Sequence, residues 1–254
     1  MTPALHVQYA GNPEGPTLLL LHGGGVAGWM WRGQLDAFSG YRLVIPDLPG
    51  HGGSLGTPFT TIEDAAKRVC QLLDGAHDTT LVGFSLGAQI AVQILAQEPG
   101  LVSRAMVVSA STEPVAYFPL LAPVLRASVP LTRLRSFARA QARASFIPDE
   151  LFGEYFETSR SLDAGSFMAM MRANQTFRIP DGWSENRVPT LVVAGEKELP
   201  SMRRSAAALA QAAPGAKLQI LPGIGHGLPL QDPGLFNELL AEWLGTQKSQ
   251  ADAR

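Results

Sequence analysis

Short apolar segments with the composition of buried β-strands recur along this chain of 254 residues, and helical patterns separate them. Residues 17–21 (TLLLL) are nearly continuous in apolar side chains, as expected for a strand buried on both faces of a parallel sheet. The expected strands are residues 5–9, 17–21, 42–45, 79–82, 104–109, 190–193 and 217–221. The expected helices are residues 61–73, 86–97, 201–212 and 233–244. This alternation predicts a doubly wound α/β fold with a mostly parallel sheet.

The alternation is interrupted once, by a long segment between the expected strands 104–109 and 190–193. Residues 113–187 have the pattern of several short helices separated by prolines. Compact domains rarely contain a structureless loop of that length. We therefore expect residues 113–187 to form a helical cap, inserted into one core domain made of residues 1–112 and 188–254.

Composition restricts the function classes that need to be considered. The formal net charge is −2, so the charge balance gives no reason to expect a nucleic acid or an anionic membrane as partner. The single cysteine, Cys70, excludes an internal disulfide and CxxC chemistry. Residues 1–9 do not resemble a secretory leader, and no apolar run approaches membrane-spanning length. We expect a soluble, cytoplasmic protein that acts on a small molecule.

A candidate nucleophile follows the expected strand 79–82, in the sequence Gly83-Phe84-Ser85-Leu86-Gly87. This G-x-S-x-G pattern lies between a strand and a helix, which is the context that the nucleophile motif requires. A sharp turn must lift the serine oxygen above the sheet, and glycines on both sides allow the backbone to make it. Ser85 is therefore the expected nucleophile.

An HGGG sequence at residues 22–25 follows the apolar strand 17–21. Acyl transfer needs two backbone amides aimed at the oxygen that becomes negatively charged, and glycines let the backbone approach closely. We assign these oxyanion-hole amides to Gly24 and Leu86, with Gly25 as an alternative to Gly24. A phosphate-binding loop is the competing interpretation, but the G-x-G-x-x-G spacing is absent.

The candidate general base is His226, which lies in the sequence GIGHG after the last expected strand. It comes last in the order serine, acid, histidine, which distinguishes the triad of the α/β scaffold from the orders on other folds. The remaining histidines are expected to be structural or exposed, namely His6, His22, His51 and His77.

The acid of the triad is the least determined member. No aspartate closely follows the strand that ends at Gly195, but Glu196 and Glu198 do. We prefer Glu198, because a position three residues beyond that strand end is where the α/β scaffold presents its acid. Glu196 remains an alternative, as does Glu113 after the preceding strand.

Taken together, these motifs resemble the α/β-hydrolase superfamily over nearly the whole chain outside the cap. HGGG, DLPGHGGS at residues 47–54, GFSLG, GEKE at residues 195–198 and GIGHG all occur in the order of that superfamily. The resemblance implies an eight-stranded, mostly parallel sheet, a mobile cap after the sixth strand, and neither cofactor nor metal. It also implies that Asp47 and His51 form turns. A serine nucleophile argues against the dehalogenases and epoxide hydrolases of the superfamily, which use aspartate.

The cap sequence carries apolar side chains that could line an acyl pocket, although many must pack within the cap itself. They are Tyr117, Phe118, Phe137, Phe146, Phe152, Tyr155, Phe156, Phe167, Met168, Met170, Met171 and Phe177. Arg135, Arg139 and Arg143 share one helix face. That face is expected to be solvated, and a site for an anionic substrate tail or an acyl-carrier protein is the alternative.

These features predict a serine hydrolase for carboxylic esters, or for lactones or thioesters, which acts through an acyl-enzyme on Ser85. Two alternatives remain open. A lyase similar to the menaquinone-pathway member of the superfamily would use the same triad, although that enzyme has glycine and arginine where this chain has Ala88 and Gln89. A small-molecule receptor on the same fold would turn over no substrate.

Overall fold

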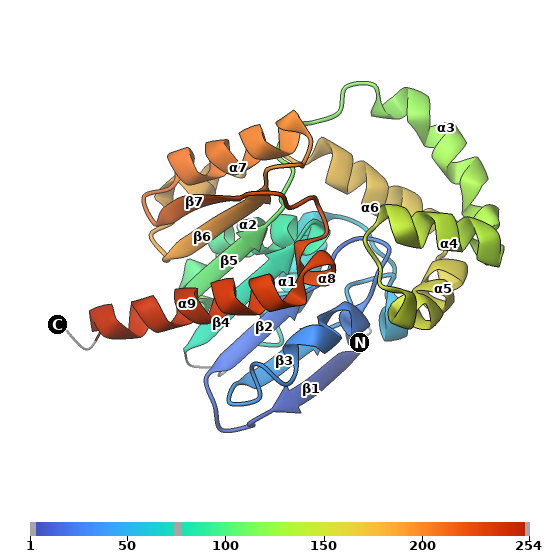
Figure 1. Ribbon diagram of the computed structural model, residues 1–254. Coiled ribbons are helices and arrows are strands. Elements are labelled where there is room, and N and C mark those ends of the chain that lie inside the picture. The colour runs from blue at the N-terminus through green and yellow to red at the C-terminus, as the bar shows by residue number, and fades with distance from the viewer. Residues whose placement is uncertain (1–3, 74–77, 252–254) are drawn as a thin grey trace.

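The computed structural model describes residues 4–73 and 78–251, which form a seven-stranded sheet with helices on both faces (Figure 1). The strands are β1 (Val7–Gly11), β2 (Thr17–Leu21), β3 (Arg42–Pro46), β4 (Thr79–Phe84), β5 (Arg104–Val108), β6 (Thr190–Gly195) and β7 (Ala216–Leu221). Their order is β1-β3-β2-β4-β5-β6-β7, and β1 runs antiparallel to β3 while the other pairs are parallel. The expected α/β fold is confirmed. His77 lies outside the described residues.

The strand count differs from the expectation. Each strand expected from the residues is present within one or two positions, but the eighth strand, which only the resemblance implied, is not among the described residues. Here β1 is the edge strand: Val7 pairs with Pro46 on one side, and no strand in the described ranges pairs with its other side.

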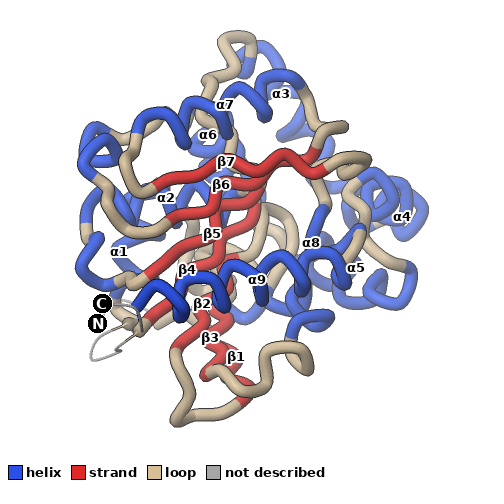
Figure 2. The backbone as a smooth tube through the Cα atoms, turned by 60° about the vertical axis from the view of Figure 1, so that its left-hand side comes forward, coloured by secondary structure: helices blue, strands red, loops and turns tan. Residues whose placement is uncertain are grey.

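The central strands are buried on both faces, which explains their nearly continuous apolar sequences. All residues of β2 and β4 are buried. Because side chains alternate along a strand, Leu19 and Leu81 pack in the core with helices α1, α2 and α7, whereas Leu18 and Val82 pack with α9. Figure 2 shows α9 crossing one face of the sheet.

The helices of the core are α1 (Ile62–Cys70), α2 (Leu86–Gln97), α7 (Pro200–Ala212), α8 (Leu228–Gln231) and α9 (Pro233–Ala251). Four of them lie where the sequence predicted helices, but α9 continues beyond residue 244 to Ala251, and the short α8 was not predicted. Helix α1 begins at a cap in which the Thr61 hydroxyl accepts a hydrogen bond from the Asp64 amide at 3.1 Å. Its Ile62, Ala65, Ala66 and Val69 face the core.

The segment between β5 and β6 is helical, as its sequence suggested. It contains α3 (Phe118–Ser128), α4 (Arg135–Ala144), α5 (Phe152–Ser161) and α6 (Ala164–Thr176). These four helices gather beyond one end of the sheet (Figure 1). In parallel α/β sheets, ligands bind at the carboxyl ends of the strands.

Candidate active site

Three residues that the sequence singled out come from three different strand ends. Ser85 follows β4, Glu198 follows β6, and His226 follows β7. Since these strands are parallel, their carboxyl ends meet at the same edge of the sheet. Residues separated by up to 141 positions in the chain therefore lie within hydrogen-bonding distance.

Ser85 occupies a strained turn between β4 and α2. Its backbone has φ 53° and ψ −112°, a conformation that costs an L-residue on the order of 1–3 kcal/mol. The turn requires glycine on both sides of Ser85. A side chain at Gly83 would collide with the Gly87 backbone, and one at Gly87 would collide with the Leu21 backbone. The Ser85 amide donates to the Val108 carbonyl at 2.9 Å, which ties the turn to β5.

His226 joins the other two residues in one chain of hydrogen bonds. Its Nε2 lies 3.1 Å from Ser85 Oγ, and its Nδ1 lies 3.0 Å from Glu198 Oε2. An ionised carboxylate can only accept, so Nδ1 carries the proton and Nε2 is free to accept the Ser85 hydroxyl proton. The ring also packs against Phe84, with centroids 5.3 Å apart.

The Glu198 carboxylate is held on both oxygens, and its side chain is fully buried. Oε1 accepts from the Ser109 hydroxyl at 2.7 Å and from the Gly195 amide at 2.8 Å. Burial by itself would raise the pKa of Glu198, but the hydrogen bonds from His226, Gly195 and Ser109 and the charge on His226 hold that pKa below its usual value. Glu198 therefore stays ionised beside the imidazole.

Ser109 is a site residue that the sequence interpretation did not identify. It directly follows β5 and has φ 59°, in the left-handed region. Its amide donates to the Val193 carbonyl at 2.8 Å, while its hydroxyl orients Glu198. The available signal was a polar residue at the carboxyl end of a buried strand, next to the strand that supplies the acid.

The two alternative acids lie elsewhere. Glu196 accepts a hydrogen bond from the Gly223 amide at 2.9 Å and is exposed. Glu113 is partly exposed and forms a bidentate ion pair with Arg204, which lowers the pKa of Glu113 through hydrogen bonding. Neither carboxylate contacts the His226 ring.

The glycine loop at residues 22–25 lies beside Ser85. The Gly25 amide is already occupied, because it donates to His51 Nε2 at 3.1 Å. Among the described residues, neither the Gly24 amide nor the Leu86 amide has a protein acceptor. A side chain at Gly24 would come within 2.9 Å of the Met170 sulfur, so Met170 of α6 packs directly over this loop.

Two buried histidines hold the loops around the site. His22 accepts from the Leu48 amide at 2.8 Å, and burial, together with the neighbouring His51, lowers the pKa of His22 to about 3. Burial also lowers the pKa of His51. Asp47 accepts from the Gly28 and Gly53 amides at 2.8 and 2.7 Å. These residues bind backbone and fix loop shape.

The arginines on α4 are engaged away from Ser85. The Arg139 guanidinium lies 3.7 Å from the centroid of the Phe152 ring, and it pairs with Asp149 at 2.7 Å. Arg135 lies over Phe152 and Phe156. None of the three arginines lines a cavity beside Ser85.

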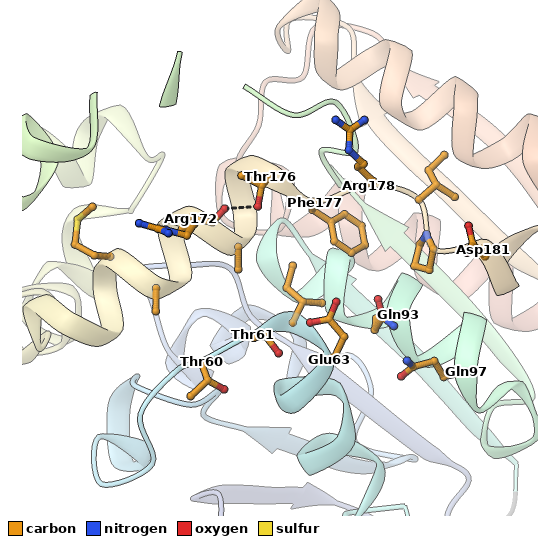
Figure 3. A pocket seen from close by; sticks show the side chains of 16 residues that line it. Thr60, Thr61, Glu63, Gln93, Gln97, Arg172, Thr176, Phe177, Arg178 and Asp181 are labelled. Carbon is orange, nitrogen blue, oxygen red and sulfur yellow. Dashed lines mark hydrogen bonds between the residues drawn. The ribbon is translucent and has the colours of Figure 1, made fainter. Parts of the chain in front are cut away.

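Two cavities open onto Ser85, with volumes of about 180 and about 560 Å³. A groove of about 920 Å³ lies between α1, α2 and α6, and Figure 3 shows Glu63, Gln93 and Arg172 around it. Its lining contains none of Ser85, Glu198 and His226. The two smaller cavities are therefore the candidate substrate site.

In residues 4–73 and 78–251, no cluster of three or more His, Cys, Asp or Glu side chains could hold a metal ion. None of the helices in these ranges combines the length and apolar composition that a membrane-spanning helix needs.

Residues 18–239 match the profile of the alpha/beta hydrolase family. The chain belongs to this family. The resemblance inferred from the five sequence motifs is thereby confirmed.

The alpha/beta hydrolase fold is also that of the solved structure of a hydrolase from Pseudomonas aeruginosa PA01. The two chains superpose with a TM-score of 0.79 over 95% of this chain and 94% of the other, at 22% sequence identity. At that identity the similarity establishes the fold alone.

One curated relative, an AB hydrolase superfamily protein from Gibberella zeae, is 27% identical over 93% of this chain and 83% of its own length. Two others align over less than half of their length. A pimeloyl-[acyl-carrier protein] methyl ester esterase from Nitrosomonas europaea is 30% identical over 109 residues, which is 42% of each protein. A 2-succinyl-6-hydroxy-2,4-cyclohexadiene-1-carboxylate synthase from Escherichia coli O1:K1 / APEC is 36% identical over 98 residues, 37% of this chain and 39% of the synthase. The family thus includes both ester hydrolysis and a different reaction.

Proposed function

We propose that this alpha/beta hydrolase cleaves carboxylic esters of small molecules through a Ser85-His226-Glu198 triad and an acyl-enzyme intermediate. The observation that carries the proposal is the continuous hydrogen-bond chain, 3.1 Å from Ser85 to His226 and 3.0 Å from His226 to Glu198. Nucleophile, base and orienting acid are the groups that acyl transfer requires, in the contact order it requires.

In the first step, Ser85 Oγ attacks the acyl carbon while His226 Nε2 takes the hydroxyl proton. The carbonyl oxygen becomes negatively charged, and the Gly24 and Leu86 amides are placed to donate to it. The imidazolium is stabilised by the ionised Glu198. When the ester C–O bond breaks, His226 returns the proton to the departing alcohol, and the acyl group stays on Ser85.

In the second step, a water molecule gives a proton to His226 and attacks the acyl carbon. The bond to Ser85 Oγ breaks, the serine regains its proton, and the carboxylic acid leaves. A lactone or a thioester would react through the same groups. In a thioester the leaving atom is sulfur instead of oxygen, and in a lactone the leaving oxygen stays linked to the acyl group.

A panel of p-nitrophenyl esters, lactones and acyl thioesters tests this proposal. Wild type should hydrolyse at least one class, and Ser85→Ala should lose a factor on the order of 10⁴ or more in kcat, because triad members act as a unit. A serine-directed phosphonate should label Ser85 alone in wild type. Activity above about a tenth in Ser85→Ala, or labelling at another residue, would contradict the assignment.

A lyase reaction is the second candidate, favoured by the synthase among the relatives. A lyase would show no burst of p-nitrophenol with an activated ester, whereas an acyl-enzyme should give a burst of about one equivalent. Gln89 argues against the lyase: its side-chain amide donates to the Ser111 and Asn174 carbonyls at 2.8 and 3.0 Å, so it is engaged in holding the fold. Ligand binding with no turnover of any substrate would instead indicate a receptor.

A further inference from the structure

The two cavities at Ser85 differ in size and meet at the nucleophile. The small chamber has a volume of about 180 Å³ and the large chamber about 560 Å³. Among the described residues, three line both chambers: Ser85, His226 and Phe146. The first two belong to the proposed triad, so Phe146 is the side chain that stands between the chambers without taking part in the chemistry.

Both chambers have mixed linings. The small chamber is lined by the glycine loop and by Val26, Phe84, Ala144, Ile147 and Tyr155. The large chamber combines polar side chains, among them Asn174, Gln175 and Gln231, with the apolar Val115, Leu199 and Met202. The chambers therefore differ chiefly in size. An ester has two halves joined at the reacting carbonyl, so each chamber can take a half of a different size.

The Phe146 ring is seated on the loop that carries the histidine. A side chain at Gly227 would come within 2.6 Å of Phe146 Cβ, and one at Gly225 would come within 2.9 Å of the end of the ring. Glycines on both sides of His226 therefore make room for this ring. The contact fixes the ring next to the imidazole.

The backbone at Phe146 is unusual for such a residue. Helix α4 ends in a motif in which the Ile147 amide donates to the Ala142 carbonyl and the Phe146 amide donates to the Arg143 carbonyl. The residue at this place in the motif is left-handed and is usually glycine. Here it is phenylalanine with φ 58°. A bulky residue is disfavoured in that conformation, so local stability gives no reason for a phenylalanine.

We propose that Phe146 is a specificity-determining partition, which restricts one half of the ester to a compact group and directs the larger half into the other chamber. The inference rests on the proposed ester hydrolysis. A cavity of about 150 Å³ holds a benzene molecule, so the small chamber should accept a group of up to about six carbons. The large chamber falls within the usual size range of ligand pockets.

Two series of esters measure this restriction. One keeps the acid constant and lengthens the alcohol, and the other keeps the alcohol constant and lengthens the acid. For wild type, kcat/KM should fall at least about tenfold in one series once the growing half exceeds about six carbons, and should stay within a few-fold in the other. The series that falls identifies the half that occupies the small chamber.

Phe146→Asn is the informative variant, because asparagine tolerates left-handed backbone and so keeps the end of α4 while removing the ring. It should recover most of the lost kcat/KM in the restricted series only. Tyr117→Ala is the matched control: Tyr117 belongs to the same inserted segment, is 62% exposed, and lines neither chamber. It should retain the wild-type cut-off. If the asparagine variant melts more than a few degrees below wild type, Phe146→Gly replaces it.

Three results would overturn the partition: equal tolerance in both series, a cut-off that survives removal of the ring, or an equal change in both series. Phosphonate labelling separates this failure from failure of the proposed function. If Ser85 is labelled and esters are cleaved, a missing cut-off refutes only the partition. If Ser85 is not labelled and no ester is cleaved, the hydrolase proposal itself fails.

Discussion

The sheet and the inserted helices α3 to α6 contrast in how their apolar residues are used. Every residue of β2 and β4 is buried, whereas Phe118 is the buried residue of α3, and Leu120 and Val124 there are 79% and 68% exposed. The sheet can form from its own apolar burial, while α3 leaves apolar surface uncovered. Apolar burial is thus complete in β4, the strand that leads to Ser85.

The segment between β5 and β6 packs on the core through apolar side chains and hydrogen bonds. Met170 is buried in one cluster with residues of α1 and α2, and Phe152 in the other cluster with residues of α9. The Trp29 indole donates to the Thr158 hydroxyl at 2.9 Å. Because the candidate triad comes from strand ends while this segment lines the cavities at Ser85, we expect the chemistry to depend on the core and the substrate range to depend on the insertion.

The largest expected effect is a difference in kcat between variants of carboxylates in the two regions. Glu198→Gln, at the edge of the sheet, should lower kcat by about 10³ to 10⁴, because an amide cannot hold the imidazole tautomer or stabilise the imidazolium. Glu113→Gln, at the start of the insertion, and Glu196→Gln should stay within a few-fold of wild type. Steady-state kinetics of the three variants measure this. Full activity in Glu198→Gln together with loss of activity in Glu113→Gln would mean that Glu113, and not Glu198, is the triad acid.

Stability should show the same contrast. Leu19→Ala removes a fully buried side chain from β2, and we expect the free energy of unfolding to fall by about 2–5 kcal/mol. Leu120→Ala removes a side chain that is 79% exposed on α3, and the change should stay within about 0.5 kcal/mol. Urea unfolding of both variants makes the comparison. A large loss in Leu120→Ala would mean that α3 is covered in solution.

Lowering the pH should destabilise the core, because its buried histidines stay neutral in the folded protein. The pKa of His22 in the folded protein is about 3, against an ordinary 6.5, and the pKa of His51 is also lowered. Above pH 6.5 both states hold these rings neutral. As the pH falls below 6.5, the unfolded chain binds protons that the folded chain does not, so His22 lowers the free energy of unfolding by about 1.4 kcal/mol per pH unit, and His51 adds a loss of the same sign.

Urea unfolding between pH 7.5 and 5 measures that slope. Glu198 adds to the loss only at lower pH: its folded pKa is depressed, so its contribution is present above the unfolded pKa and is lost as the pH falls through the folded value. Asp149→Asn, in an exposed pair of the insertion, is the control and should leave the slope unchanged. A free energy of unfolding that does not change from pH 7.5 to 5 would contradict the neutral, buried histidines.

The smallest effect concerns the insertion as a lid. If residues 113–187 close over an apolar acyl group, medium-chain esters should be preferred over acetate by about fivefold or more, and replacing the segment by a short linker should reduce that preference to near unity. Relative kcat/KM values measure it, with circular dichroism to show that the sheet remains folded. An unchanged preference would leave the lid without a role in selection.

The sequence alone determined the parts of this protein that depend on local pattern. Apolar runs identified the strands, because a strand buried on both faces must be apolar throughout. GFSLG identified Ser85, since the strained turn leaves few residue choices at positions 83 and 87. The eighth strand, which came from family likeness and from no residue of this chain, is not among the described residues.

Only the tertiary structure decided what depends on residues distant in the chain. It brought Glu198 to His226 while Glu196 and Glu113 took other partners, a choice that spacing alone left open. Ser109 and Phe146 lie at the site because they contact loops roughly 80 or more residues away in the chain. Such contacts depend on how the strand ends and the insertion pack against each other. Packing joins side chains that are distant in the sequence, so no short segment of the sequence specifies it.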